Sequence, residues 1–224
     1  MDYPAVLLAT DCGTPVLRKR VDDLNQTTDI ARAISRVTNP CFISVVVLIL
    51  MAYIGSVEFW PTVSHIALIL LGLVLLPIAY VLIRIARKGS RAERLGDLVD
   101  FLKEHPEDVG ALGMILGLPS VLVLITLDAP EFLVATLTSL LACSLIIALF
   151  RKFYRISYHL AGVTCLIIMA AQTWGQVYLA ALIAIPAIVW ARYLLREHSL
   201  AQMLAGSALA VVVCIVALYG YGLW

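Results

Sequence analysis

Charged residues are scarce in this chain of 224 residues: Asp, Glu, Lys and Arg make up only 14% of it, whereas 62% is apolar. This composition lies outside the range of soluble domains, so water is not the main solvent of the chain. The formal net charge of +1 provides none of the basic excess that binds nucleic acid. We therefore expect no nucleic-acid partner, and the positions of the few cations become informative.

The cysteines form no metal-binding or disulfide pattern. None stands in a C-x-x-C pair, and Cys12 is isolated in the N-terminal segment. The others lie within or at the edge of apolar runs: Cys41, Cys143, Cys165 and Cys214. We interpret them as packing residues, and we expect neither a metal nor any other cofactor.

The N-terminal segment, residues 1–40, has no apolar core of a secretory signal and carries several aspartates instead. We therefore expect it to stay on the cytoplasmic side. Within it, TTDIARAISRV (27–37) begins with residues that cap helices and spaces its apolar side chains on one face. This pattern predicts an interfacial helix.

Long apolar runs fill the remaining domain, residues 41–224. A spanning helix needs about 20 apolar residues, and such runs are predicted near 41–59, 63–83, 109–127, 131–150, 158–174, 177–192 and 200–223. The third run contains three glycines and a proline, and the fifth is short, so both six and seven spans fit the sequence. The predicted fold class is all-α, a polytopic transmembrane helical bundle, with a surface helix near 90–108.

Lys and Arg are unevenly distributed among the joints between these runs. They precede the first run and follow the second, fourth and sixth, whereas the joints FWPTV, LDAPE and WGQ contain none. By the positive-inside rule, the N-terminus and the basic joints face the cytoplasm. The opposite boundaries contain the tryptophans expected of an aromatic belt: Trp60, Trp174 and Trp224.

Two polar segments beside the last three runs contain the candidates for chemistry. They contribute Lys152, Arg155, Ser157 and His159 from RKFYRISYHLAG, and Arg192, His198, Gln202 and Gly206 from ARYLLREHSLAQMLAG. Both lie at expected cytoplasmic helix ends, so packing would bring them to one depth. Arg and Lys form charge-assisted hydrogen bonds to phosphate oxygens, and histidine attacks phosphorus or protonates a leaving oxygen. The segments predict a cationic pocket for the phosphate or diphosphate group of a lipid.

The spacing of these residues resembles the type-2 phosphatidic acid phosphatase (PAP2) superfamily. Ser157-Tyr158-His159 is similar to the S-G-H of its second motif. Its third motif is an arginine, five residues, a histidine, three residues and an aspartate, often followed by a small residue and glycine. Arg192 and His198 keep this spacing, Gln202 stands at the aspartate position, and Ala205-Gly206 completes the motif. The resemblance covers the C-terminal third of the chain.

The resemblance implies a PAP2-like core in the C-terminal part of the bundle and a metal-free lipid phosphatase or diphosphatase. His198 would be the nucleophile that forms a phosphohistidine, and His159 the acid for the leaving group. The phosphate-binding residues would be Lys152, Arg155, Ser157 and Arg192. Isoprenyl diphosphates, isoprenyl phosphates and phosphatidate are the substrate classes it suggests, and membrane lipids surround the site.

Two positions depart from the family pattern. The first motif, a lysine followed six residues later by Arg-Pro, is not intact, and Lys152 with Arg155 is a compressed substitute. Gln202 lacks the charge that stabilises a protonated histidine, although its amide oxygen accepts a ring N–H and so orients His198.

Other interpretations use the same residues. A non-catalytic anionic-lipid binding protein or a small transporter would need a similar cationic pocket, and arginines at helix ends also serve as membrane anchors. The absence of charge from the middle of every predicted span argues against transport. We interpret His65 and His105 as structural, and Glu197 as the partner of a neighbouring cation.

Overall fold

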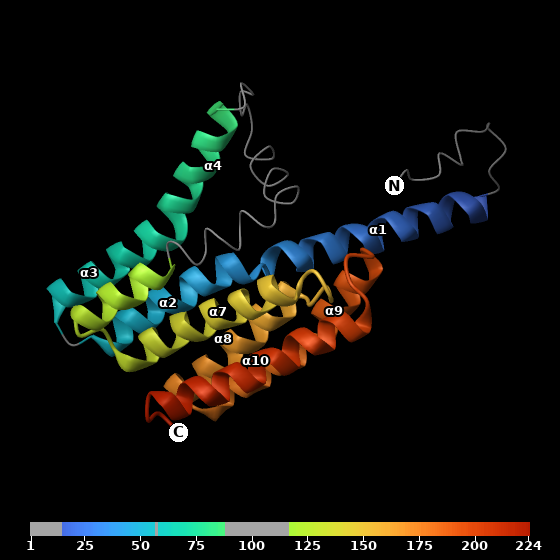
Figure 1. Ribbon diagram of the computed structural model, residues 1–224. Coiled ribbons are helices and arrows are strands. Elements are labelled where there is room, and N and C mark those ends of the chain that lie inside the picture. Colours follow the sequence, from blue (N-terminus) through green and yellow to red (C-terminus); the bar gives the residue numbers. More distant parts are fainter. Residues whose placement is uncertain (1–14, 57, 88–116) are drawn as a thin grey trace.

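The computed structural model of the protein describes residues 15–56, 58–87 and 117–224 (Figure 1), and all regular secondary structure in these ranges is helical. The prediction of an all-α fold is confirmed for these residues. The surface helix predicted near 90–108 and the first part of the 109–127 run lie outside the described residues.

The N-terminal helices α1 (Pro15–Val37) and α2 (Pro40–Gly55) are separated by only two residues. Pro40 has no N–H to continue the hydrogen bonding of α1, so the chain restarts there as a new helix. Figure 1 shows α1 continuing beyond the end of α2 and lying beside α9. The helix predicted for 27–37 is therefore present and longer than expected, while its interfacial position stays a prediction.

A second helical stretch follows as α3 (Phe59–Leu70), a π-helical turn (Leu71–Leu75) and α4 (Leu76–Arg87). α3 packs against α2, whereas α4 leaves the bundle in Figure 1. Of the third predicted run, the structure describes a helix of only ten residues, Gly117–Thr126.

The C-terminal half contains α7 (Glu131–Phe150), α8 (Tyr158–Trp174), a 3₁₀ helix η2 (Gln176–Ile183), α9 (Ala184–Leu194) and α10 (Leu200–Gly220). α8 is central, since it contacts α2, α7, α9 and α10. Glycines allow this close packing: a Cβ on Gly162 would lie 2.6 Å from Pro40 Cβ, and one on Gly206 would lie 2.5 Å from the Ser157 carbonyl oxygen.

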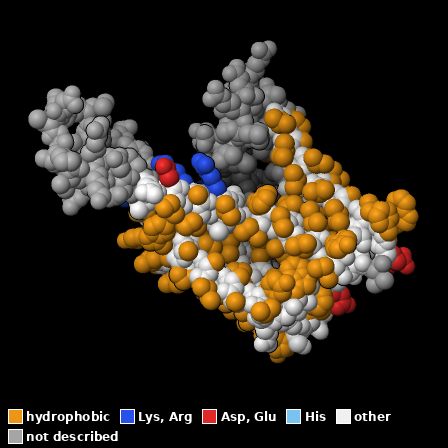
Figure 2. All heavy atoms as spheres, turned by 180° about the vertical axis from the view of Figure 1, so that it is seen from behind, with side chains coloured by type: hydrophobic (Ala, Val, Ile, Leu, Met, Phe, Trp, Pro, Cys, Tyr) orange, Lys and Arg blue, Asp and Glu red, His pale blue; other side chains and the backbone are white. Residues whose placement is uncertain are grey.

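Five helices in the described part of the chain are long and apolar enough to cross a membrane: Gln26–Gly55, Phe59–Tyr80, Glu131–Phe150, Gln176–Leu194 and Leu200–Gly220. α8 is shorter, at 17 residues. The space-filling view shows apolar side chains over most of the visible surface of the bundle (Figure 2). These features indicate a membrane-embedded protein.

Charges in the described bundle gather at its two ends. In Figure 2, Lys and Arg lie near one edge of the visible face, while a separate acidic group lies near the other. The turns α7–α8 and α9–α10 contain the cations Arg151, Lys152, Arg155 and Arg196, whereas the turns at the other ends of these helices and of α2 contain Glu58 and Asp128. The bundle therefore has a basic end and an acidic end.

His65 is a structural residue, as its sequence context suggested. Its side chain is 1% exposed. Nδ1 lies 3.3 Å from Ser56 Oγ and Nε2 lies 3.2 Å from the Leu127 carbonyl oxygen, so the ring joins α3 to two turns at the acidic end.

Cysteine packing agrees with the sequence-based interpretation for the residues that the structure shows. Cys143, Cys165 and Cys214 are buried with free thiols. Among residues 15–56, 58–87 and 117–224, no group of three or more His, Cys, Asp or Glu residues is arranged to hold a metal.

Candidate functional site

The two predicted motifs meet at the basic end, where α8 and α10 begin side by side. Ser157 caps α8, since its Oγ accepts from the Leu160 N–H at 3.5 Å. Ser199 caps α10 in a capping box with Gln202. The Ser157 N–H donates to the Gln202 carbonyl oxygen at 3.1 Å and joins the caps directly. Gly206 makes this approach possible because it presents no Cβ to Ser157.

Gln202 determines which nitrogen of His198 carries the proton. The Ser199 backbone N–H donates to Gln202 Oε1 at 3.1 Å, so this atom is an acceptor. His198 Nδ1 lies 3.2 Å from the same oxygen and therefore donates to it. The neutral ring then keeps a lone pair on Nε2, the form that a nucleophilic histidine needs.

His159 is buried beside the junction of α1 and α2, with 5% of its surface exposed. Thr38 Oγ1 donates its proton to the Ile34 carbonyl oxygen at 2.7 Å. The same hydroxyl must therefore accept from His159 Nε2, 3.0 Å away. Nε2 therefore carries the proton of the neutral ring, and Nδ1 carries the lone pair. Arg192 lies close enough for its charge to act on this ring.

Arg192 is held by contacts at the end of α9. Its guanidinium donates to Ser35 Oγ of α1 at 3.0 Å and pairs with Glu197 at 2.5 Å. Its side chain is 16% exposed, and its buried Nε has no partner in the described part of the structure. Glu197 is thus the partner of a cation, as expected, and Arg192 ties α9 to α1.

The two remaining predicted cations are more accessible. Lys152 and Arg155 are exposed in the turn between α7 and α8. The charge of Arg155 acts on His198, which places this guanidinium in the neighbourhood of the ring.

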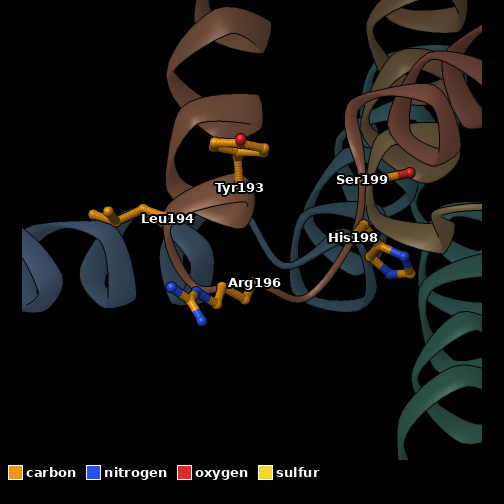
Figure 3. A pocket seen from close by; sticks show the side chains of 5 residues that line it. All are labelled: Tyr193, Leu194, Arg196, His198 and Ser199. Atoms are coloured by element: carbon orange, nitrogen blue, oxygen red, sulfur yellow. The ribbon is translucent and has the colours of Figure 1, made fainter.

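Beside His198 lies an open pocket of about 460 Å³, lined by Tyr193, Leu194, Arg196, His198 and Ser199. Figure 3 shows Tyr193 and Leu194 on the last turn of α9, Arg196 at the lowest point of the connecting turn, and His198 and Ser199 on its far side. A ligand in this pocket would meet an apolar side, a guanidinium and an imidazole.

Burial lowers the pKa of His198 below its usual value. The hydrogen bond to Gln202 and the charge of Glu197 raise it, while the charges of Arg192 and Arg155 lower it further. The overall effect favours the neutral ring, and hence the Nε2 lone pair, near pH 7.

Three residues of this region were not singled out from the sequence as ligands of the site: Ser35, Thr38 and Arg196. Ser35 and Thr38 are 157 and 121 positions from their partners Arg192 and His159, and no local pattern signals contacts at that separation. Arg196 was interpreted as one of the basic residues that set the topology. Its left-handed backbone conformation could not be predicted from the sequence.

Comparison of the chain with protein-family models, with curated proteins and with solved structures finds no match. The functional argument therefore depends on the site itself.

Proposed function

We propose that the protein is a membrane-embedded lipid phosphate phosphatase or diphosphatase with a PAP2-like core in its C-terminal part. The observation that carries this proposal is the His198 ring, whose Nδ1–H is held by Gln202 while Nε2 is left with a lone pair beside a cationic pocket. In catalytic histidines, a hydrogen bond from one ring nitrogen commonly fixes the tautomer, so that the other nitrogen is free to react.

In the proposed reaction, His198 Nε2 attacks phosphorus and the bond from phosphorus to the leaving oxygen breaks. The neutral His159 ring, whose Nε2–H is engaged by Thr38, takes up a proton from solvent at Nδ1 and gives it to that oxygen. Water then attacks the phosphohistidine, His159 takes up a proton from this water, and inorganic phosphate and free His198 are released. The products are the alcohol, or the monophosphate when the substrate is a diphosphate, and phosphate.

The surrounding cations support this reaction electrostatically. Arg155 and Arg192 act on the histidines through their charges, and such preorganised charge stabilises the extra negative charge of the transition state. Lys152 adds charge in the same turn. The backbone of Ser157 holds the α8 and α10 caps together, and this fixes the relative position of His159 and His198.

The proposed substrate is a lipid because the site lies where apolar helices end. We place this basic end, and with it the N-terminus, at the cytoplasmic face of a bundle of six or seven spans. Isoprenyl phosphates, isoprenyl diphosphates and phosphatidate present their phosphates at this depth with the tail in the bilayer.

Phosphate release by the purified protein in detergent tests the proposal. We expect release from at least one of prenyl diphosphate, prenyl phosphate and phosphatidate, and its loss in His198→Ala. Arg32→Ala is the matched control, because Arg32 is an exposed arginine whose guanidinium pairs with Asp29 at 3.0 Å and not with a residue of the site. No release by a folded wild-type protein would refute the phosphatase.

A second candidate, an anionic-lipid binding protein without chemistry, is favoured by two observations. Glu197 already neutralises Arg192, and the neutral Gln202 forms a capping box of a purely structural kind. Quenching with detergent at alkaline pH, where phosphohistidine is stable, during turnover of ³²P-labelled lipid separates the candidates: an enzyme labels His198 covalently, whereas a binder retains the lipid and labels nothing.

A further inference from the structure

The turn after α9 adopts a helix-ending motif that normally requires glycine. The Arg196 N–H donates to the Tyr193 carbonyl at 3.0 Å and the Glu197 N–H to the Arg192 carbonyl at 3.2 Å, which together form a Schellman motif. Its left-handed position is Arg196, with φ of 55°. A side chain there costs about 1 kcal/mol relative to glycine. The chain thus places an arginine where local stability favours no side chain.

The Arg196 guanidinium is exposed, unlike that of Arg192. Both Arg196 and His198 line the pocket. Figure 3 shows the Arg196 side chain extending from the bottom of the turn, on the side away from the His198 ring. Within the ranges that the structure describes, no hydrogen bond or ion pair engages it. Arg192, by contrast, would have to give up Glu197 and Ser35 before it could bind a ligand fully, and breaking a partly buried ion pair is costly.

The apolar side of the pocket completes the pattern. Tyr193 and Leu194 are 58% and 39% exposed on the last turn of α9. Both line the pocket, so a hydrocarbon chain bound there would contact them. The lining therefore combines a cationic group, apolar side chains and the His198 ring.

We propose that this pocket binds a phosphate-bearing amphiphile. The Arg196 guanidinium binds its phosphate directly, and its tail contacts Tyr193 and Leu194. A guanidinium forms two parallel hydrogen bonds to phosphate oxygens. Arg192 then acts as the structural tie between α9 and α1. The role of Arg196 rests on the proposed function for its ligand class, a lipid phosphate, but it concerns binding and does not require hydrolysis.

Equilibrium binding of dodecylphosphonate, whose carbon–phosphorus bond resists hydrolysis, tests this inference in the purified full-length protein. We expect Arg196→Gly to lose about tenfold or more in affinity. Arg196→Lys should recover part of it, because lysine keeps the charge but not the paired geometry. The matched control is Arg32→Ala, which should bind as the wild type does.

The glycine variant separates binding from folding. Since glycine suits the left-handed conformation, Arg196→Gly should melt at the wild-type temperature or above it. Wild-type affinity in this variant, or no binding of dodecylphosphonate to the wild type, would overturn the proposal.

A second ligand tests the apolar part of the inference. Inorganic phosphate should bind more weakly than dodecylphosphonate, and equal affinities would refute the tail contact. Arg196-dependent binding together with no hydrolysis of any lipid would uphold this inference and refute the phosphatase.

Discussion

Gln202 Oε1 accepts two hydrogen bonds, one from the Ser199 N–H that closes the α10 capping box and one from His198. Glutamate is equally suited to a capping box, so Gln202→Glu should keep the fold and place a carboxylate against His198 Nδ1. A carboxylate at this distance should raise the pKa of His198 by about one to three units. Titration of the ring by NMR with ¹³C-labelled histidine checks this. An unchanged His198 pKa would show that the side chains do not meet.

The lowered pKa of His198 gives a pH dependence with a definite sign. As the pH falls below about 6.5, the usual value for histidine, the unfolded chain protonates this ring before the folded protein does. The stability contributed by its neutral form is therefore complete above that pH and is lost as the pH falls toward the folded-state pKa.

We predict that the free energy of unfolding decreases more between pH 7 and pH 5 in the wild type than in His198→Gln. Denaturant unfolding in detergent at several pH values measures the difference, and all other titrating groups are shared by the two proteins. Parallel pH profiles would contradict the prediction.

At the scale of the element, the contact between α8 and α10 depends on a glycine. A Cβ on Gly206 would lie 2.5 Å from the Ser157 carbonyl oxygen, a backbone atom that cannot move alone. Gly206→Ala should cost about 1–3 kcal/mol, as overpacking does, and should lower the melting temperature in detergent. Gly220 on the same helix is the control, because a Cβ there meets nothing within 4 Å. Equal melting temperatures for the two alanine variants would disprove the close contact.

The turn between α1 and α2 is tied to the site by Thr38, whose hydroxyl accepts from His159 Nε2. Thr38→Val keeps the shape of the side chain but leaves a buried ring N–H unsatisfied, at a cost of about 1–3 kcal/mol. Thr38→Ser retains the hydroxyl and should melt closer to the wild type. Melting curves of the two variants in detergent measure the difference. Equal melting temperatures would mean that the hydrogen bond between Thr38 and His159 contributes nothing to stability.

Sequence patterns predicted the helices best where each boundary has a local cause. The runs expected at 131–150 and 158–174 coincide with α7 and α8, because Pro130 and the Ser157 cap define their starts. The 27–37 helix was underestimated, since nothing in a polar amphipathic stretch reveals that α9 will pack against it. The 3₁₀ geometry of η2 was likewise not expected from a uniform apolar run.

The candidate site was predicted in part for the same reason. The link from His198 to Gln202 spans four positions along the chain and is local to the start of α10, where Ser199 and Gln202 form the capping box. The contacts of Arg192 with Ser35 and of His159 with Thr38 are tertiary, and the left-handed Arg196 depends on how α9 ends. Composition and spacing therefore found the ring that could react, but not the residues that position its neighbours.

At the scale of the whole molecule, the separation of charge predicts how the bundle sits in a membrane. α7 has 20 residues, about 30 Å at 1.5 Å per residue, the thickness of a bilayer core. Asp128 precedes it at the acidic end and Lys152 follows it at the basic end. By the positive-inside rule, we expect Lys152 on the cytoplasmic side and Asp128 on the opposite side.

Labelling with a membrane-impermeant maleimide tests this arrangement in oriented vesicles. Lys152→Cys should react only from the cytoplasmic side and Asp128→Cys only from the other, with the wild type as the blank for the native cysteines. If both variants react from the same side, α7 does not cross the membrane. If both sides are exchanged, α7 crosses in the opposite direction, and the His198 pocket then faces the outer leaflet, where a substrate lipid would have to be supplied from that side.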